Sequence, residues 1–197
     1  MLVNNAGYGL VGALEAVDPP QLERQFATNV FGCVYAIQAC LPHFRDRGAG
    51  LIINVSSIGG RIALPFNSLY HGTKFAIEGI SESLALELAP HAIRVKIVEP
   101  GGVKTDFAGR SLDLMHKDGL DAYDASLQRV MAVFTSPDRA SGYSEASDIA
   151  DVIYTAATDG TDRLRYLAGK DAAAMAIDRA RMSDEEYARW AISSFDL

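Results

Sequence analysis

The chain has 197 residues, of which 49% are hydrophobic and 22% are charged. Its net charge of −7, without a basic cluster, argues against a nucleic-acid partner. No apolar run reaches the about 18 residues of a membrane-spanning helix, so we expect no membrane partner. This size and composition are typical of one globular domain, which we expect to cover residues 1–197.

The N-terminal residues and the cysteines bear on the cellular compartment. Residues 1–7 lack the basic region and the long apolar stretch of a signal peptide. Cys33 and Cys40 lie in one helical pattern, about 10 Å apart along the axis, which is too far for a disulfide. We therefore expect reduced thiols and a cytoplasmic protein.

The first part of the chain alternates between strand and helix patterns. A strand stub at residues 2–3 is followed by a glycine-rich loop over 7–12. An aspartate and two prolines at 18–20 predict the start of a helix that continues to about residue 45. The β-branched run at 51–55 predicts a buried parallel strand, and a second long helix is expected from about 69 to 88.

The second part continues the alternation after one irregular stretch. A strand is predicted at 94–98, then a polar and partly helical region at 105–147, a helix to about 157, and a strand at 165–168. The tail at 171–194 predicts one or two short helices. This order indicates an α/β fold with a parallel sheet, in which ligands bind beyond the carboxyl ends of the strands.

Tyr70 and Lys74 are the strongest candidates for chemistry. They are four residues apart and share a helix face with Ile77, Ser81 and Leu84, which we expect to face the sheet. Ser57 ends the preceding strand, so a hydroxyl, a phenol and an ammonium can converge. Reduction of a ketone needs a proton donor, and a nearby cation lowers the pKa of a tyrosine toward neutral pH. The pair alone also arises by chance on helices.

Asn29 falls on the apolar stripe of the 20–45 helix, where a buried amide needs hydrogen-bond partners. Two alternatives follow from this position. Asn29 either bonds neighbouring backbone in a structural role, or orders a water beside Lys74.

Five motifs together resemble the short-chain dehydrogenase/reductase family, in the family's order and spacing. They are Asn4-Asn5-Ala6-Gly7, Asn29 within Thr28–Gly32, Asn54-Val55-Ser56-Ser57, Tyr70-x-x-x-Lys74, and Pro100-Gly101-Gly102-Val103-Lys104-Thr105. The resemblance implies a Rossmann-like sheet flanked by helices and an oxidoreductase that transfers hydride between NAD or NADP and an alcohol or ketone.

The resemblance also implies a role for each matching residue. Tyr70 would be the general acid and base, Lys74 would lower its pKa and bind the nicotinamide ribose, Ser57 would position the carbonyl, and Asn29 would support a proton-relay water. The cofactor would be flanked by Asn4, Ala6 and Gly7 and bordered by Pro100, Gly101, Val103 and Thr105. A glycine at 101 would let the backbone approach the nicotinamide ring.

The glycine-rich pyrophosphate turn that opens this family, G-x-x-x-G-x-G, is not found in the sequence. By resemblance, residues 2–3 match the family's fourth strand, so we expect an N-terminally truncated sheet of strands 4–7 whose first strand is an exposed edge. The residue that would select NAD or NADP is expected in the missing strands as well. The alternative function is therefore an inactive remnant or interaction module that cannot bind the dinucleotide alone.

The remaining expectations concern the substrate, the partners and the scattered charged residues. Region 105–147 takes the place of the family's substrate loop, and its apolar residues line a pocket or simply pack on the body of the protein. The family forms oligomers through the helices that match 20–45 and 69–88. The four histidines lack the spacing of a metal site. Glu78, Glu82 and Glu87 predict a solvated helix face.

Overall fold

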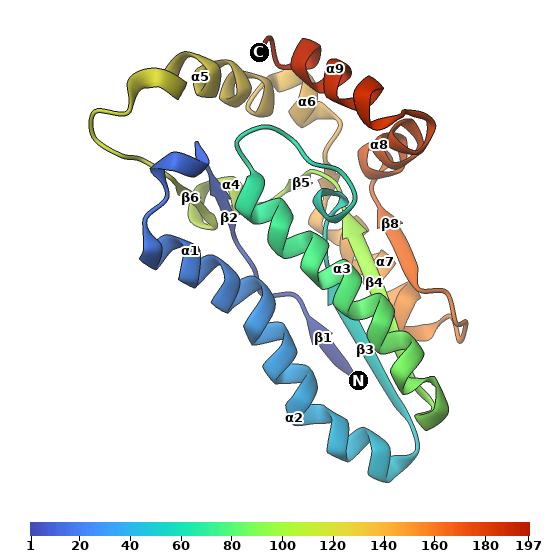
Figure 1. Cartoon of the computed structure of the whole chain (residues 1–197). Helices are drawn as coiled ribbons and strands as arrows, with labels where there is room; N and C mark the ends of the chain where they lie inside the picture. The colour runs from blue at the N-terminus through green and yellow to red at the C-terminus, as the bar shows by residue number, and fades with distance from the viewer.

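A four-stranded parallel sheet forms the centre of the molecule (Figure 1). The computed structural model describes residues 1–197, except the side chain of Ala108. The sheet contains β1 (Leu2–Asn4), β3 (Gly50–Val55), β4 (Ile93–Pro100) and β8 (Arg165–Ala168), in the order β1-β3-β4-β8. The predicted α/β, Rossmann-like arrangement is confirmed, and β1 lies at one edge of this sheet.

Helices cover both faces of the sheet, which explains why the strands are apolar on both sides. Helices α2 (Gly32–Arg47) and α3 (Ser68–Leu88) pack on one face, where the core contains Ile37, Phe44, Ile52, Leu88, Ile93 and Val95. Helix α7 (Ala146–Thr158) packs on the other face, where the core contains Leu51, Ile53, Val98, Ile149, Ala156, Tyr166 and Ala168. The alternation between residues 51, 52 and 53 is that of a strand buried on both sides.

The helix predicted over 20–45 is divided by a π-helical turn. It consists of α1 (Pro19–Phe26), a π-helical segment at Ala27–Phe31, and α2. Asp18 caps it, as the sequence indicates, and the structure adds a capping box with Gln21. The π-helical turn places Asn29 in the interior, and such turns are frequent at functional sites.

Short elements missed by the sequence lie around the carboxyl end of the sheet. The predicted glycine loop contains β2 (Gly9–Val11), which pairs in parallel with β6 (Leu112–Leu114). Another small pair joins β5 (Val103–Lys104) to β7 (Ser144–Glu145). These strands have only two or three residues, which is too short for a recognisable alternation.

The rest of region 105–147 and the tail are mainly helical. The helices are α4 (Phe107–Arg110), α5 (Asp124–Phe134), α6 (Pro137–Ser141), α8 (Lys170–Arg181) and α9 (Asp184–Ser194). A 3₁₀ turn at Asp121–Tyr123 precedes α5, and other 3₁₀ turns lie earlier in the chain, at Leu14–Ala16, Ile58–Gly60 and Ala89–His91. Both cysteines are free thiols. Among the described residues, no helix combines the length and the apolar character needed to cross a bilayer.

Candidate active site

Ser57, Tyr70 and Lys74 are brought to the carboxyl end of the sheet by two consecutive elements. Ser57 follows β3 and caps the short turn Ile58–Gly60, where its Oγ accepts a hydrogen bond from Gly59 N at 3.0 Å. The same hydroxyl donates to Pro100 O at 3.4 Å, which connects the ends of β3 and β4. Tyr70 lies in the first turn of α3 and Lys74 one turn later.

Tyr70 contacts the first helix of region 105–147. Its ring packs edge-on against Phe107, with centroids 6.3 Å apart. Burial raises the pKa of Tyr70, and the nearby hydroxyl of Ser57 opposes this rise. The phenol is therefore held in its neutral, proton-donating form.

Lys74 is buried and, among the described residues, has one hydrogen-bond acceptor, the carbonyl of Val55 at 3.1 Å from Nζ. Burial lowers the pKa of Lys74 to about 8, and the nearby Cys33 and Glu78 oppose this. The Nζ lies 5.8 Å from the centroid of the Tyr70 ring. The ammonium donates to the carbonyl of Val55, and the role of Lys74 in lowering the pKa of Tyr70 stays a prediction.

The Asn29 side chain is hydrogen-bonded within the protein. Its Oδ1 accepts from Tyr8 N at 3.0 Å, and its Nδ2 donates to Tyr8 O at 2.9 Å and to Thr73 Oγ1 at 3.1 Å. These bonds tie the π-helical turn to the loop after β1 and to α3. The Asn29 amide thereby connects the π-helical turn, the loop after β1 and α3.

Asn4 is the last residue of β1, and Gly7 lies in the loop that follows it. Asn4 Nδ2 donates to Asn54 Oδ1 at 2.8 Å, and Asn54 Nδ2 donates to Ser81 Oγ at 2.8 Å, so a buried chain of polar groups joins β1, β3 and α3. A Cβ on Gly7 would lie 3.3 Å from Asn29 Oδ1 and 3.7 Å from Lys74 Nζ. Ala6 is exposed beside them. The first motif therefore adjoins Lys74.

The loop after β4 is shaped by two residues that the sequence did not indicate. Asp171, in the first turn of α8, accepts a hydrogen bond from Gly102 N at 2.6 Å. A Cβ on Gly101 would lie 2.3 Å from Asp171 Oδ1, and one on Gly102 would lie 2.1 Å from the Tyr143 ring. Packing against these side chains already requires both glycines, independently of a nicotinamide ring. Beyond them, Val103 lies in β5 and the exposed Thr105 accepts from Phe107 N at 3.3 Å.

The comparisons with known proteins agree with this arrangement. The family model for short chain dehydrogenase matches residues 1–114. An uncharacterised oxidoreductase of Schizosaccharomyces pombe is 42% identical over 174 residues, which are 86% of this chain and 70% of the relative. The chain belongs to the short-chain dehydrogenase/reductase family.

Solved structures of this family resemble the whole chain. A short-chain dehydrogenase from Streptomyces avermitilis has a TM-score of 0.79 at 30% identity, covering 99% of this chain and 68% of that one. A short chain dehydrogenase from Burkholderia cenocepacia, solved in complex with NADP, has a TM-score of 0.71 at 27% identity, covering 96% and 68%. The protein is an oxidoreductase of this family. The family match begins at residue 1, so the expected truncation is not confirmed by it.

His71 is a further residue beside the site of this dehydrogenase, and the sequence did not indicate it. Its Nε2 accepts from Leu64 N at 2.9 Å, so Nδ1 carries the proton and donates to Gly59 O at 2.7 Å. Burial lowers the pKa of His71, which favours this neutral form. The ring thus holds both ends of the loop after Ser57 against α3. Only the adjacency of His71 to Tyr70 could have drawn attention to it.

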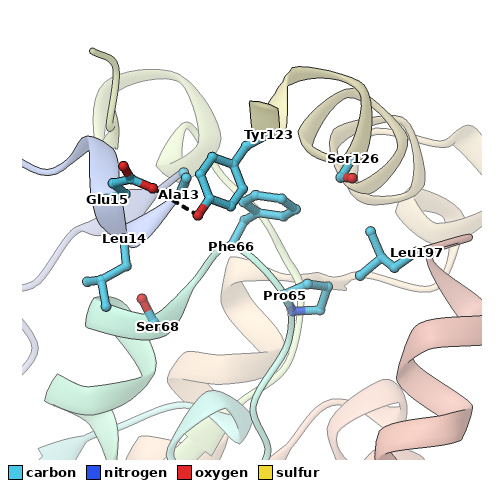
Figure 2. A pocket seen from close by; sticks show the side chains of 10 residues that line it. Ala13, Leu14, Glu15, Pro65, Phe66, Ser68, Tyr123, Ser126 and Leu197 are labelled. Carbon is cyan, nitrogen blue, oxygen red and sulfur yellow. Dashed lines mark hydrogen bonds between the residues drawn. The ribbon is translucent and has the colours of Figure 1, made fainter. Parts of the chain in front are cut away.

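Both alternatives for region 105–147 of the dehydrogenase occur in the structure. Met115 and Val130 are buried, and Phe134 packs against Phe195 with ring centroids 5.4 Å apart. Tyr123 instead lines a cavity of about 390 Å³, over which its hydroxyl donates to Glu15 Oε2 at 3.0 Å (Figure 2). The cavity is also lined by Pro65 and Phe66, which precede α3, by Ser68 at the start of α3, and by Leu197.

One prediction about α3 is wrong. Glu78 is buried, whereas Glu82 is exposed as expected. Arg165 of β8 reaches α3 and donates from Nε to Glu78 Oε2 at 3.0 Å and from Nη2 to Glu82 Oε2 at 2.8 Å. Sequence spacing cannot reveal the burial of Glu78, because Arg165, which covers this helix face, is 87 residues away from Glu78 in the chain.

Proposed function

We propose that this dehydrogenase transfers hydride between NAD or NADP and an alcohol or ketone, with Tyr70 as the general acid and base. The observation that carries the proposal is the convergence of Ser57, Tyr70 and Lys74 at the carboxyl end of the sheet. The NADP complex of the Burkholderia cenocepacia relative supports the cofactor class.

The donors at this site fit the nicotinamide-ribose part of such a cofactor. Lys74 Nζ is buried and has one acceptor among the described residues, which leaves N–H groups for ribose hydroxyls. In this proposal Lys74 and Tyr70 hold the ribose, Asn4, Ala6 and Gly7 flank the cofactor, and Pro100, Gly101, Val103 and Thr105 border it. When bound, the nicotinamide supplies or accepts the hydride.

The protein's own residues then handle the proton. Tyr70 donates its phenolic proton to the substrate oxygen during reduction and takes a proton back during oxidation. Ser57 donates a hydrogen bond to the same oxygen and holds it beside the phenol. The Lys74 cation favours the tyrosinate that forms. Asn29 orders a relay water beside Lys74 in this proposal, since its Oδ1 and Lys74 Nζ both face Gly7.

Region 105–147 forms the substrate side of the single domain 1–197 in this proposal. The ring of Phe107 contacts Tyr70. This apolar neighbour of the proposed acid favours a moderately apolar alcohol or ketone. Exposed apolar residues on the two long helices, Phe31, Tyr35, Phe75 and Leu86, support a homo-oligomer formed through these helices.

The alternative is a chain that does not bind a dinucleotide by itself and serves as an interaction module. It is favoured by one observation: β1 is the edge of the sheet, and residues 1–197 hold no glycine-rich pyrophosphate turn. Binding of the cofactor therefore separates the two functions.

Fluorescence titration of the purified chain with NADH and with NADPH tests the proposal. We expect saturable binding that weakens in Lys74→Met and is unchanged in Lys117→Met, which removes an exposed lysine. Reduction of an apolar ketone, followed as loss of cofactor absorbance, should accompany binding. A folded chain that binds neither cofactor would overturn the enzymatic proposal and leave the interaction module.

A further inference from the structure

A group of charged side chains lies beneath the active site, outside the residues proposed for catalysis. Glu99, the penultimate residue of β4, is fully buried, and Glu78 of α3 is nearly so. Arg61, which follows the turn after Ser57, and Arg165 of β8 lie around them. Such burial of two carboxyl groups is unusual, because a buried charge is costly unless it is paired.

The two arginines only partly neutralise the negative charges of the two carboxyl groups. Arg165 Nε bonds Glu78 Oε2 at 3.0 Å but lies 3.5 Å from Glu99 Oε1, and Arg61 Nη1 lies 3.6 Å from Glu99 Oε2. Among the described residues, Glu78 Oε1 and both carboxyl oxygens of Glu99 are buried without a hydrogen-bond donor. A proton on the pair is the donor that would satisfy these oxygens.

The two carboxyl groups are close enough to interact directly. Arg165 Nε lies 3.0 Å from Glu78 Oε2 and 3.5 Å from Glu99 Oε1, so one guanidinium spans both carboxyl groups. Burial raises the pKa of Glu99, the charge of Glu78 raises it further, and Arg61 and Arg165 oppose the rise. A second negative charge beside the first is disfavoured in the interior. The geometry and the unsatisfied oxygens therefore both favour one shared proton.

Three members of this group are near a proposed site residue in the chain. Arg61 is four residues after Ser57, Glu78 is one helical turn after Lys74, and Glu99 directly precedes Pro100. The contacts of the group thus join the turn after Ser57, the helix of Tyr70 and Lys74, and the carboxyl end of β4.

We propose that Glu78 and Glu99 are positioning residues that share one proton and, as a singly charged pair, hold these three segments in their catalytic arrangement. The charged groups that face the pair are Lys74 and Glu82 on α3, Arg61 and Arg165. When the pair loses the shared proton, the two buried negative charges repel each other and loosen the segments. The catalytic part of this inference rests on the proposed function; the protonation of the pair does not.

The sign of the stability effect follows from the raised pKa of the folded state. The pair's contribution is fully present below the unfolded pKa of about 4.5 and is lost as the pH rises through about 7. Because one proton is involved, the folding equilibrium constant falls by up to about tenfold per pH unit in this window. Glu99→Gln mimics the protonated state and should remove the dependence.

The decisive experiment is a ¹³C NMR titration of glutamate-labelled full-length chain, with urea unfolding measured between pH 5 and pH 8. We expect one carboxyl resonance with a midpoint near 7, absent in Glu99→Gln and retained in Glu82→Gln, which removes an exposed carboxylate on the same arginine. Glu99→Gln should also lack the loss of stability that wild type and Glu82→Gln show. If every glutamate resonance has a midpoint below about 5.5, the shared proton is refuted.

Catalytic measurements test the positioning role separately. The ratio of kcat in Glu99→Gln to kcat in wild type should rise by at least about twofold between pH 6 and pH 8 at saturating cofactor, with KM for the cofactor little changed. A pH-independent ratio overturns the positioning role. If Glu99→Gln does not fold, Glu78→Gln replaces it, because it neutralises the same pair from α3. Absence of activity in every variant, with the NMR midpoint near 7 retained in wild type, refutes the proposed function and leaves the shared proton standing.

Discussion

Asp171 accepts a hydrogen bond from the backbone N–H of Gly102 at 2.6 Å, and this bond fixes the loop at the end of β4 from the first turn of α8. The carboxylate also covers the position that a side chain on residue 101 would occupy. The glycines of this loop are therefore explained by contacts within the protein.

Gly101→Ala tests this relationship. Its Cβ would lie 2.3 Å from Asp171 Oδ1, and Asp171 is held in place by Gly102, so we expect a loss of about 1–3 kcal/mol in the free energy of unfolding. Gly79→Ala is the matched control, because Gly79 lies on the exposed face of α3 with no atom within 4 Å of the added Cβ; it should stabilise by about 0.5–1 kcal/mol. Urea unfolding measures both. Equal effects would show that the Asp171 contact does not constrain residue 101.

Tyr70→Phe removes the proposed proton donor and keeps the ring that packs on Phe107. We expect kcat for ketone reduction to fall by at least about 100-fold, because general acid catalysis contributes 10²–10⁴-fold. Cofactor binding and the melting temperature should stay close to those of the wild type, since the ring contact remains. Retention of more than a tenth of wild-type kcat would exclude Tyr70 as the acid.

Ser57→Ala removes the hydroxyl that opposes the rise in the pKa of Tyr70. The pKa that governs alcohol oxidation should therefore move to higher pH, and kcat at neutral pH should fall by about 10–100-fold. A pH profile of oxidation measures the shift. The neighbouring Ser56→Ala serves as the control, because the buried Oγ of Ser56 has no hydrogen-bond partner among the described residues. An equal shift in both variants would assign the effect to the loop and not to the Ser57 hydroxyl.

Lys74→Met tests the buried ammonium through stability alone. Burial lowers the folded pKa of Lys74 to about 8, so between pH 8 and its ordinary value of 10.5 the unfolded chain binds more protons. The free energy of unfolding of the wild type should gain up to about 3 kcal/mol across this window, and Lys74→Met should lack that gain. Lys117→Met, at an exposed position, should keep it. Parallel curves for wild type and Lys74→Met would mean that the ammonium is solvated.

The sequence was sufficient for features that depend on neighbouring residues. The spacing of Tyr70 and Lys74 placed them on one helix face, and the β-branched runs at 51–55 and 94–98 predicted two strands of the sheet. The cap at Asp18 marked a helix start correctly. Helical periodicity, strand composition and capping are local properties, and so they can be read without the fold.

The partners of the site residues depend on contacts across the chain. The amide of Asn29 is bonded to Tyr8 and Thr73, and the ammonium of Lys74 is bonded to the carbonyl of Val55. The short pair β2–β6 joins segments about 100 residues apart. A sequence pattern carries no information on such pairings, because each depends on how the helices and loops are packed.

By itself, the sequence determined the family, the α/β alternation and the identity of the proposed catalytic side chains, because these are encoded in short motifs with fixed spacing. Only the tertiary structure decided which polar groups are buried and what they contact. It placed Glu78 beside Glu99 and Asp171 beside Gly101, pairs that are 21 and 70 residues apart in the chain. Burial in a low-dielectric interior turns such contacts into pKa shifts and packing constraints, and it exists only after the chain has folded.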